Sequence, residues 1–230
     1  IIIACDGANS KVREKIAIDL RRHNFNQTAL SFELKVNSEI QKQAFQFFLK
    51  ESILAVLPIR QGLVSIVWSC NSNFFTKLNG LDDKSIENEL SQIIGNYYKD
   101  IKITSKKESF PLFMNSVESI FKDRVLLVGD SAHFIHPMAG QGLNLGIRDI
   151  ISLEKIIDRK NYLDIGLRGF LRKYERARKE DVSQMGFLTL GLNWIFSKKS
   201  SIVIGLIEKG MGVLDKSKFL KQQLIKKAIS

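Results

Sequence analysis

One stretch, VLLVGDSAHFIHPMAGQGLNLGIRD at residues 125–149, limits the fold of this chain more than any other feature. Its first four residues are all apolar, which is typical of a strand covered on both faces, and its end has the apolar spacing of a helix. A Gly-Asp pair follows the strand directly. Because open α/β folds bind ligands at the carboxyl ends of their strands, we expect Asp130 to lie at such a site.

Glycines surround the predicted start of the helix. Gly140 and Gly142 lack side chains, so a flat or charged ligand could approach the backbone N–H groups there, and Gly146 follows one turn later. A helix N-terminus also favours negative charge. Gly-Asp pairs and single glycines are common in ordinary turns. Their combined order of strand, Gly-Asp, histidines, proline, glycines and helix nevertheless indicates a functional site.

The beginning of the chain predicts a second strand and helix. Residues 1–5 are an apolar run that we expect to form a buried strand, followed by Asp6-Gly7. Ser10 can cap a helix that begins near Lys11. Arg13 stands where a capping box would have Glu or Gln, so that motif is incomplete.

The middle of the chain has mostly β character. The segments ILAVLPI and LVSIVWSC flank an Arg60-Gln61-Gly62 turn and predict a hairpin. Helical spacing is expected over residues 73–80 and 84–98, and again beyond residue 166. The sequence therefore predicts a mostly antiparallel sheet with a few helices, inserted in an α/β layer and followed by a helical C-terminal region.

Composition excludes several classes of protein. The 44% hydrophobic content over 230 residues indicates a globular chain, and two cysteines exclude a disulfide framework. Residues 151–230 contain 17 Lys and Arg against 8 Asp and Glu. This excess fits a solvated helical face, or attraction to an anionic membrane surface or acidic partner. No apolar run reaches the length of a membrane span, and no motif indicates nucleic acid.

Two other chemical interpretations of the histidines are weaker. His133, His136 and His23 are the only histidines and lack the ligand set of a zinc site, so we expect no metal. Ser131 and His133 could form a hydrolase dyad, but no G-x-S-x-G elbow surrounds the serine. We expect His133 to pack structurally.

The stretch from Gly129 to Asn144 resembles the second FAD-binding motif of the single-component, group A flavoprotein aromatic hydroxylases, with Ser131 where alanine is usual. The family's D-G-x-x-S-x-V-R motif is also present, at residues 6–13. Other stretches resemble the ubiquinone-biosynthesis hydroxylases of this family, namely AVLPIRQGLVSIVWS, SFPL, LRKYERARKED and LKQQLIKKA.

This resemblance implies a para-hydroxybenzoate-hydroxylase-like fold of mixed α/β class. Residues 1–24 and 117–165 would form the FAD-binding domain, residues 25–116 an inserted antiparallel-sheet substrate domain, and residues 166–230 a helical C-terminal region. The family's N-terminal βαβ unit with G-x-G-x-x-G has no counterpart here, so the chain is expected to be N-terminally truncated and to bind FAD weakly alone. Cys5 stands where the family usually has alanine, which predicts a small buried residue.

The resemblance also implies the residues that bind the cofactor. Asp130 would contact the ribityl chain of FAD, and the glycine-rich helix start would lie against the pyrimidine end of its ring. Pro137 would fix the backbone beside the ring. No catalytic base is assigned. The full set of predicted cofactor-binding residues is Asp6, Gly7, Arg13, Gly129, Asp130, Pro137, Gly140, Gln141, Gly142, Leu143 and Asn144.

The implied function is an FAD-dependent monooxygenase that uses NAD(P)H and O₂ to hydroxylate a polyprenylated phenol in ubiquinone biosynthesis. It would act in the cytoplasm, with peripheral association at the inner membrane or in a multi-enzyme complex through basic C-terminal helices. Two alternatives stay open: a flavin hydroxylase of a soluble aromatic compound, and a noncatalytic membrane-surface or assembly module.

Overall fold

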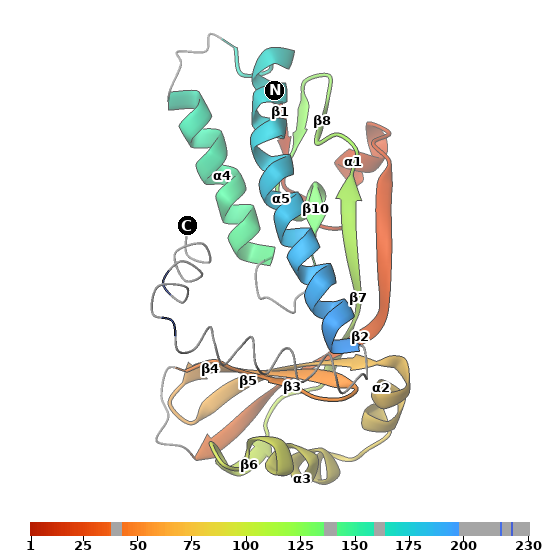
Figure 1. Ribbon diagram of the computed structural model, residues 1–230, viewed down its shortest axis with the longest axis vertical. Coiled ribbons are helices and arrows are strands. Elements are labelled where there is room, and N and C mark those ends of the chain that lie inside the picture. The colour runs from red at the N-terminus through yellow and green to blue at the C-terminus, as the bar shows by residue number, and fades with distance from the viewer. Residues whose placement is uncertain (38–42, 136–141, 159–163, 198–216, 218–221, 223–230) are drawn as a thin grey trace. The chain divides into compact units, whose positions relative to one another are not determined.

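A computed structural model describes residues 1–37, 43–135, 142–158 and 164–197, together with residues 217 and 222 (Figure 1). The chain divides into a compact unit of residues 1–189 and a second unit of residues 190–230. Among the described residues, no helix is both long enough and apolar enough to cross a bilayer.

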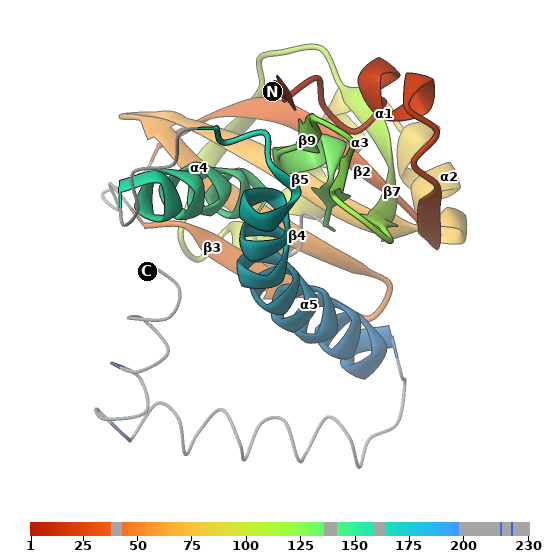
Figure 2. The same cartoon turned by 90° about the horizontal axis from the view of Figure 1, so that it is seen from above.

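A small sheet contains the two strands that precede the predicted cofactor-binding motifs. Its order is β1-β9-β8, with β1 (Ile2–Ala4) parallel to β9 (Val125–Leu127) and β8 (Phe121–Lys122) antiparallel to β9. Three helices contribute side chains to its hydrophobic core: α1 (Lys11–Lys15), α4 (Gly142–Asp158) and α5 (Arg168–Ser197). Figure 2 shows these helices and β9 from above. Leu126, Leu127 and Tyr174 are fully buried in this core.

Two expectations about the first strand are wrong. Residues 1–5 were expected to be buried, but Ile2 is 60% exposed and only Ala4 belongs to the core. Cys5, expected to be buried, is exposed. The physical reason is that β1 lies at the edge of the small sheet and pairs on one side only among the described residues.

A larger, antiparallel sheet occupies most of the first 135 residues. Its strand order is β10-β7-β2-β5-β4-β3, and β6 also pairs with β2. Its strands are β2 (Leu20–Asn37), β3 (Phe45–Phe48), β4 (Ser52–Arg60), β5 (Leu63–Asn71), β6 (Lys99–Ile103), β7 (Glu108–Val117) and β10 (His133–Phe134). The predicted hairpin is confirmed, because β4 and β5 pair across a turn in which Gly62 has φ +72°.

One face of this sheet is covered by two helices, α2 (Ser72–Asn79) and α3 (Asp83–Ile94), close to the predicted ranges. Their first turns are capped by the side chains of Asn71 and Asp82, which accept hydrogen bonds from backbone N–H groups. Alternate residues of the strands, such as Phe32, Ile66 and Trp68, point into the core beneath these helices. The predicted mixed α/β fold with a large antiparallel sheet is confirmed.

Candidate functional site

The Asp6-Gly7 and Gly129-Asp130 motifs come together at the carboxyl ends of the two parallel strands of the small sheet. Ala4 lies opposite Leu127 in the parallel pair, so the chain leaves both strands at the same end. Asp6-Gly7 follows one strand, and Gly129-Asp130 follows the other. Gly129 begins the short 3₁₀ turn η1 (Gly129–Ser131) with φ +65°, a conformation that favours glycine. The structure thus brings two predicted parts of the site together.

Arg13 and Ser131 tie these motifs to each other. The buried guanidinium of Arg13 donates hydrogen bonds to the backbone carbonyl oxygens of Ser131 at 2.8 Å and Ala8 at 2.9 Å. The Ser131 hydroxyl lies 2.7 Å from the carbonyl oxygen of Ala4 and 2.8 Å from that of Val128. Arg13 is therefore engaged with the backbone, and its role in binding the cofactor stays a prediction.

Asp6 lies at the start of α1. Its carboxylate accepts a hydrogen bond from the backbone N–H of Val12 at 3.1 Å. The predicted helix cap is confirmed, because the Ser10 hydroxyl accepts from the N–H of Arg13 at 2.9 Å. Hydrogen bonding to Ser10 is the main cause that lowers the pKa of Asp6, so this carboxylate stays ionised at neutral pH.

Asp130 has the properties expected of a ligand-binding carboxylate. Its side chain is half-buried in the turn and accepts no hydrogen bond from the described residues. Burial raises the pKa of Asp130, an effect that the charge of His133 opposes and that of Asp149 increases. A partly desolvated carboxylate without a donor gains from a ligand hydroxyl. This half-buried acceptor therefore fits the hydroxyl groups of the ribityl chain of FAD.

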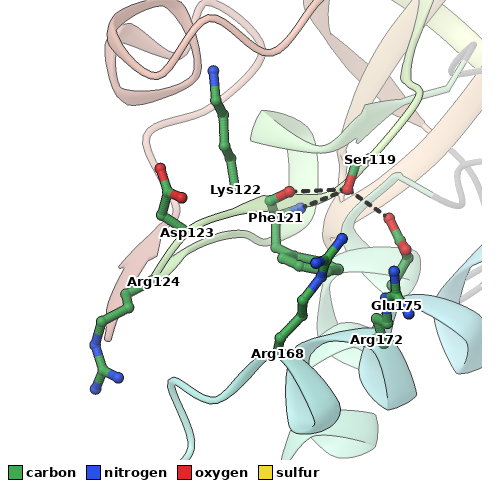
Figure 3. A pocket seen from close by; sticks show the side chains of 8 residues that line it. All are labelled: Ser119, Phe121, Lys122, Asp123, Arg124, Arg168, Arg172 and Glu175. Atoms are coloured by element: carbon green, nitrogen blue, oxygen red, sulfur yellow. Dashed lines mark hydrogen bonds between the residues drawn. The ribbon is translucent and has the colours of Figure 1, made fainter.

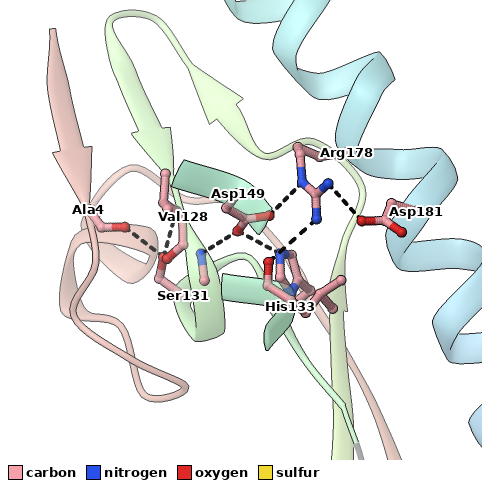
Figure 4. Close-up of polar contacts among 9 residues, drawn as sticks. Ala4, Val128, Ser131, His133, Asp149, Arg178 and Asp181 are labelled. Carbon is pink, nitrogen blue, oxygen red and sulfur yellow. Dashed lines mark hydrogen bonds and ion pairs between the residues drawn. The ribbon is translucent and has the colours of Figure 1, made fainter. Parts of the chain in front are cut away.

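Behind this turn, the buried Asp149 of α4 joins three elements, as Figure 4 shows. Oδ2 of Asp149 accepts a hydrogen bond from the backbone N–H of Gly129 at 2.7 Å and lies 2.8 Å from Nε2 of His133. Because an ionised carboxylate only accepts hydrogen bonds, the contact with His133 requires that the imidazole carries a proton on Nε2. Asp149 is 1% exposed, so the site contains a carboxylate that sequence reasoning missed.

Arg178 of α5 neutralises this buried carboxylate. Its Nε donates to Oδ1 of Asp149 at 2.6 Å, and its Nη1 donates to Oδ2 of Asp181 at 2.8 Å. Burial raises the pKa of Asp149, but the hydrogen bonds from His133 and Gly129 and the charge of Arg178 outweigh it and leave the pKa below its ordinary value. Asp149 is therefore ionised, and α5 is anchored behind the Gly129 turn.

The helix predicted after the glycines begins at Gly142. A Cβ built on Gly142 would meet no described atom within 4 Å, so the space beside this helix start is open among the described residues. A Cβ on Gly146 would lie 3.8 Å from the Cα of Gly129, which places the second turn of α4 against the turn after β9. Leu143 is 77% exposed at this end of the helix.

Several predicted residues lie outside the described part of the chain. Pro137, Gly140 and Gln141 fall within residues 136–141, so the structure does not place them. Asn144 lies in the first turn of α4, where it takes part in an interaction. The described part of the predicted site therefore consists of the turns after β1 and β9 and the start of α4.

Asp149 and Arg178 had a signal in the sequence. Asp149 lies four residues after Leu145 and four before Leu153, on the buried stripe of α4. Arg178 likewise follows Tyr174 by four residues on the buried face of α5. A charged residue on an apolar helical stripe predicts a buried ion pair, because an unpaired charge there is costly.

The two alternative chemical interpretations gain no support. The Ser131 hydroxyl is directed at backbone carbonyl oxygens, whereas His133 is paired with Asp149, so the two side chains form no dyad. Among the residues that the structure describes, no three His, Cys, Asp or Glu side chains gather as metal ligands. His136 is outside that part of the chain.

A parallel strand pair with aspartate turns at its carboxyl ends, followed by a helix whose glycine start is open among the described residues, is typical of domains that bind a nucleotide cofactor. The sequence pattern of one such family, the FAD binding domain, matches residues 1–185, and the chain belongs to this family. The cofactor of this family is FAD.

Curated relatives are similar over nearly the whole chain. Ubiquinone hydroxylase UbiL of Rhodospirillum rubrum is 29% identical, over 100% of this chain and 54% of the relative. The mitochondrial ubiquinone biosynthesis monooxygenase COQ6 is 29% identical in Dictyostelium discoideum, over 98% of this chain and 54% of the relative. The human COQ6 protein is 26% identical, over 98% of this chain and 56% of the relative. The chain thus spans about half the length of these relatives.

Solved structures share the fold at lower identity. The p-nitrophenol 4-monooxygenase PnpA of Pseudomonas putida has a TM-score of 0.74 and 15% identity, covering 99% of this chain and 59% of that one. PqsL of Pseudomonas aeruginosa, described as a probable FAD-dependent monooxygenase, has a TM-score of 0.72 and 20% identity, covering 86% of this chain and 56% of that one.

Proposed function

We propose that this chain is the flavin-holding and substrate-facing part of an FAD-dependent monooxygenase, which uses NAD(P)H and O₂ to hydroxylate a polyprenylated phenol in ubiquinone biosynthesis. The observation that carries the proposal is that the turns with Asp6 and Asp130 follow the carboxyl ends of β1 and β9, near the start of α4, which is open among the described residues. The names of the UbiL and COQ6 relatives support the pathway.

The residues of the turn after β9 would hold the cofactor. FAD supplies the redox and oxygen chemistry when bound. The carboxylate of Asp130, which accepts no hydrogen bond from the described residues, would accept hydrogen bonds from ribityl hydroxyls and so fix the position of the ring. The first N–H groups of α4, at Gly142 and beyond, would stabilise negative charge on the ring. Asp149 would keep the turn in place by holding the N–H of Gly129.

The large sheet would supply the substrate wall. Leu57 pairs with Ser65, which pairs with Glu33, and Phe110 pairs with Ala29. Because Ala29 and Glu33 are four residues apart on β2, Leu57 and Phe110 point to the same face of the sheet. This is the face opposite α2 and α3, whose core contains Leu30, Phe32 and Leu34.

Exposed apolar side chains on that face suit an apolar substrate. Leu57 is 42% exposed and Phe110 is 50% exposed. Such side chains can bury a phenol ring and the first part of a polyprenyl chain, and they exclude water from the reaction. For access to a membrane-dissolved substrate, the protein would associate with the cytoplasmic side of the inner membrane through basic residues of α5.

The test has a binding arm and an activity arm. FAD is titrated into the purified chain and its Asp130→Ala variant, with the flavin fluorescence as the readout. We expect the variant to bind FAD more weakly than the parent. The full-length gene product should then hydroxylate a polyprenylated phenol with NAD(P)H. Unchanged FAD affinity in Asp130→Ala would contradict the site, and hydroxylation of soluble phenols alone would contradict the substrate class.

A further inference from the structure

A cavity lies between the β8–β9 hairpin and the first turns of α5. It has a volume of about 630 Å³ and is shown in Figure 3. This volume is within the range of small-molecule sites, roughly 300–1,000 Å³. Its lining residues are mostly charged: Ser119, Phe121, Lys122, Asp123, Arg124, Arg168, Arg172 and Glu175.

Much of the charge in this cavity is already paired. Arg124 forms two hydrogen bonds of 2.8 Å with the carboxylate of Asp164. Oε1 of Glu175 accepts hydrogen bonds from the Ser119 hydroxyl at 2.9 Å and from the N–H of Ile120 at 3.1 Å. These contacts fix the walls of the cavity, because they join the hairpin and the residues just before it to α5 and to the segment that leads into α5.

Two arginines in the cavity have no such partner. Neither Arg168 nor Arg172 makes a hydrogen bond or ion pair with the described residues. They are four residues apart on α5, so both lie on one face of the helix, where like charges repel. Figure 3 shows both side chains next to Phe121 and Glu175. A bound anion would relieve the repulsion between the two guanidinium groups.

The cavity is separate from the proposed flavin site. Lys122 and Arg124 precede β9, at the amino end of that strand, whereas Gly129 and Asp130 follow its carboxyl end. Among the residues that the structure describes, none of those proposed to hold FAD lines the cavity. A ligand in it would therefore use a site that the flavin function leaves free.

We propose that Arg168 and Arg172 bind a phosphate group in this cavity. A guanidinium presents a planar set of N–H donors that matches two oxygens of a phosphate, and two guanidinium groups one helical turn apart can hold one phosphate between them. Lys122 also lines the cavity, but its ammonium donates to the carbonyl oxygen of Ile16 at 2.7 Å and points away from the two arginines in Figure 3. The proposal does not depend on flavin binding.

The experiment is a calorimetric titration of inorganic phosphate into the 230-residue chain at low ionic strength. The test variant is Arg168→Gln with Arg172→Gln. The matched control is Lys173→Gln with Arg176→Gln, which removes the same charge from exposed residues of α5 that do not line the cavity. We expect the test variant to bind phosphate at least about tenfold more weakly, because charge-assisted hydrogen bonds are lost. The control should bind it nearly as the parent does.

A second arm identifies the source of the phosphate. The same proteins are sedimented with vesicles of phosphatidylglycerol and of phosphatidylcholine. Binding to phosphatidylglycerol that the test variant loses, and that inorganic phosphate competes away, supports a lipid headgroup as the ligand. Phosphate binding by the parent without vesicle binding supports a free phosphate ester.

Two results would overturn the proposal. If both double variants lose affinity equally, the effect is one of overall charge on α5 and the cavity holds no site. If the parent chain binds phosphate no better than chloride, the two arginines are solvated surface charges.

Discussion

The backbone N–H of Gly129 donates a 2.7 Å hydrogen bond to Oδ2 of Asp149, a carboxylate 20 residues further along the chain. The same oxygen contacts His133, and the other carboxylate oxygen accepts from Arg178. A buried ion pair on two helices therefore sets the position of the turn that presents Asp130. Changes to this pair should affect both stability and the candidate cofactor site.

Replacing Asp149 with asparagine should destabilise the protein strongly. Among the described residues, Arg178, whose side chain is 6% exposed, would keep only Asp181 as a charged partner. Breaking a buried ion pair typically costs about 3–5 kcal/mol, and the remaining contact with Asp181 points to the lower end of that range. Urea unfolding of the parent and Asp149→Asn measures the loss. Asp164→Asn, in the exposed pair with Arg124, is the control and should change little. Equal losses in the two variants would contradict a special role for the buried pair.

The same carboxylate should shape the acid side of the stability profile. The pKa of Asp149 in the folded chain is below its ordinary value of about 3.9. Its contribution is therefore fully present above that ordinary pKa and is lost as the pH falls through the lower folded pKa. Unfolding free energies measured from neutral pH down to about pH 3 should fall less steeply in Asp149→Asn than in the parent. Parallel profiles for the two proteins would show that other carboxylates dominate.

Binding of FAD should depend on the protonation of Asp130. Burial raises its pKa, so the carboxylate becomes protonated at a higher pH than an ordinary aspartate. The protonated form is a weaker acceptor for a ribityl hydroxyl, and we expect roughly a tenfold loss of FAD affinity as the pH falls through this pKa. Asp130→Asn should bind FAD more weakly at neutral pH but lose this pH dependence. Fluorescence titrations of both proteins across the acid range test the assignment, which fails if the variant keeps the parent's profile.

Gly142→Val should separate cofactor binding from folding. A side chain there meets no described atom, so the melting temperature should change little. In the flavin-bound protein the branched side chain would instead displace the ring from the start of α4 and remove stabilisation of its negative charge. Losing one such donor typically costs about 3 kcal/mol in the transition state, roughly a hundredfold in rate.

The matched control is Gly129→Ala, at a residue with φ +65°. It should lower the melting temperature, because L-residues are strained in that conformation by about 1–2 kcal/mol. Normal flavin content together with normal hydroxylation in Gly142→Val would show that the helix start does not face the ring.

Ser131 is a departure from the alanine that related motifs have, and it is fully buried. Its hydroxyl contacts the carbonyl oxygen of Ala4, which also accepts a hydrogen bond from the N–H of Val128. Ser131→Ala should therefore cost only about 1 kcal/mol, since that carbonyl keeps one partner. Urea unfolding gives this value, and Ser119→Ala, in a half-buried hydrogen bond to Glu175, provides a comparison. A stabilising effect would mean that the serine is strained in the turn.

The sequence by itself determined the local elements and the chemical class of the site. The cap at Ser10, the hairpin around Gly62 and the helix that begins at Gly142 each depend on residues close together in the chain, so they were predicted nearly in place. The order of strand, Gly-Asp and glycine-rich helix start likewise indicated a ligand site, because backbone geometry and ligand access depend on those residue types at those spacings. The resemblance of this stretch to the second FAD-binding motif of the group A hydroxylases then implied that the ligand is a flavin.

Only the tertiary structure decided how these parts meet. Arg13 and Ser131 are 118 residues apart, and their hydrogen bond, with the parallel pairing of β1 and β9, brings the two aspartate turns together. The partners of Asp149 and the exposure of Ile2 and Cys5 were also settled there. Periodicity in a sequence shows which residues face inward, but it does not show which distant segment they face or whether a strand lies at a sheet edge. Long-range packing decides both, because burial and charge neutralisation depend on neighbours from other elements.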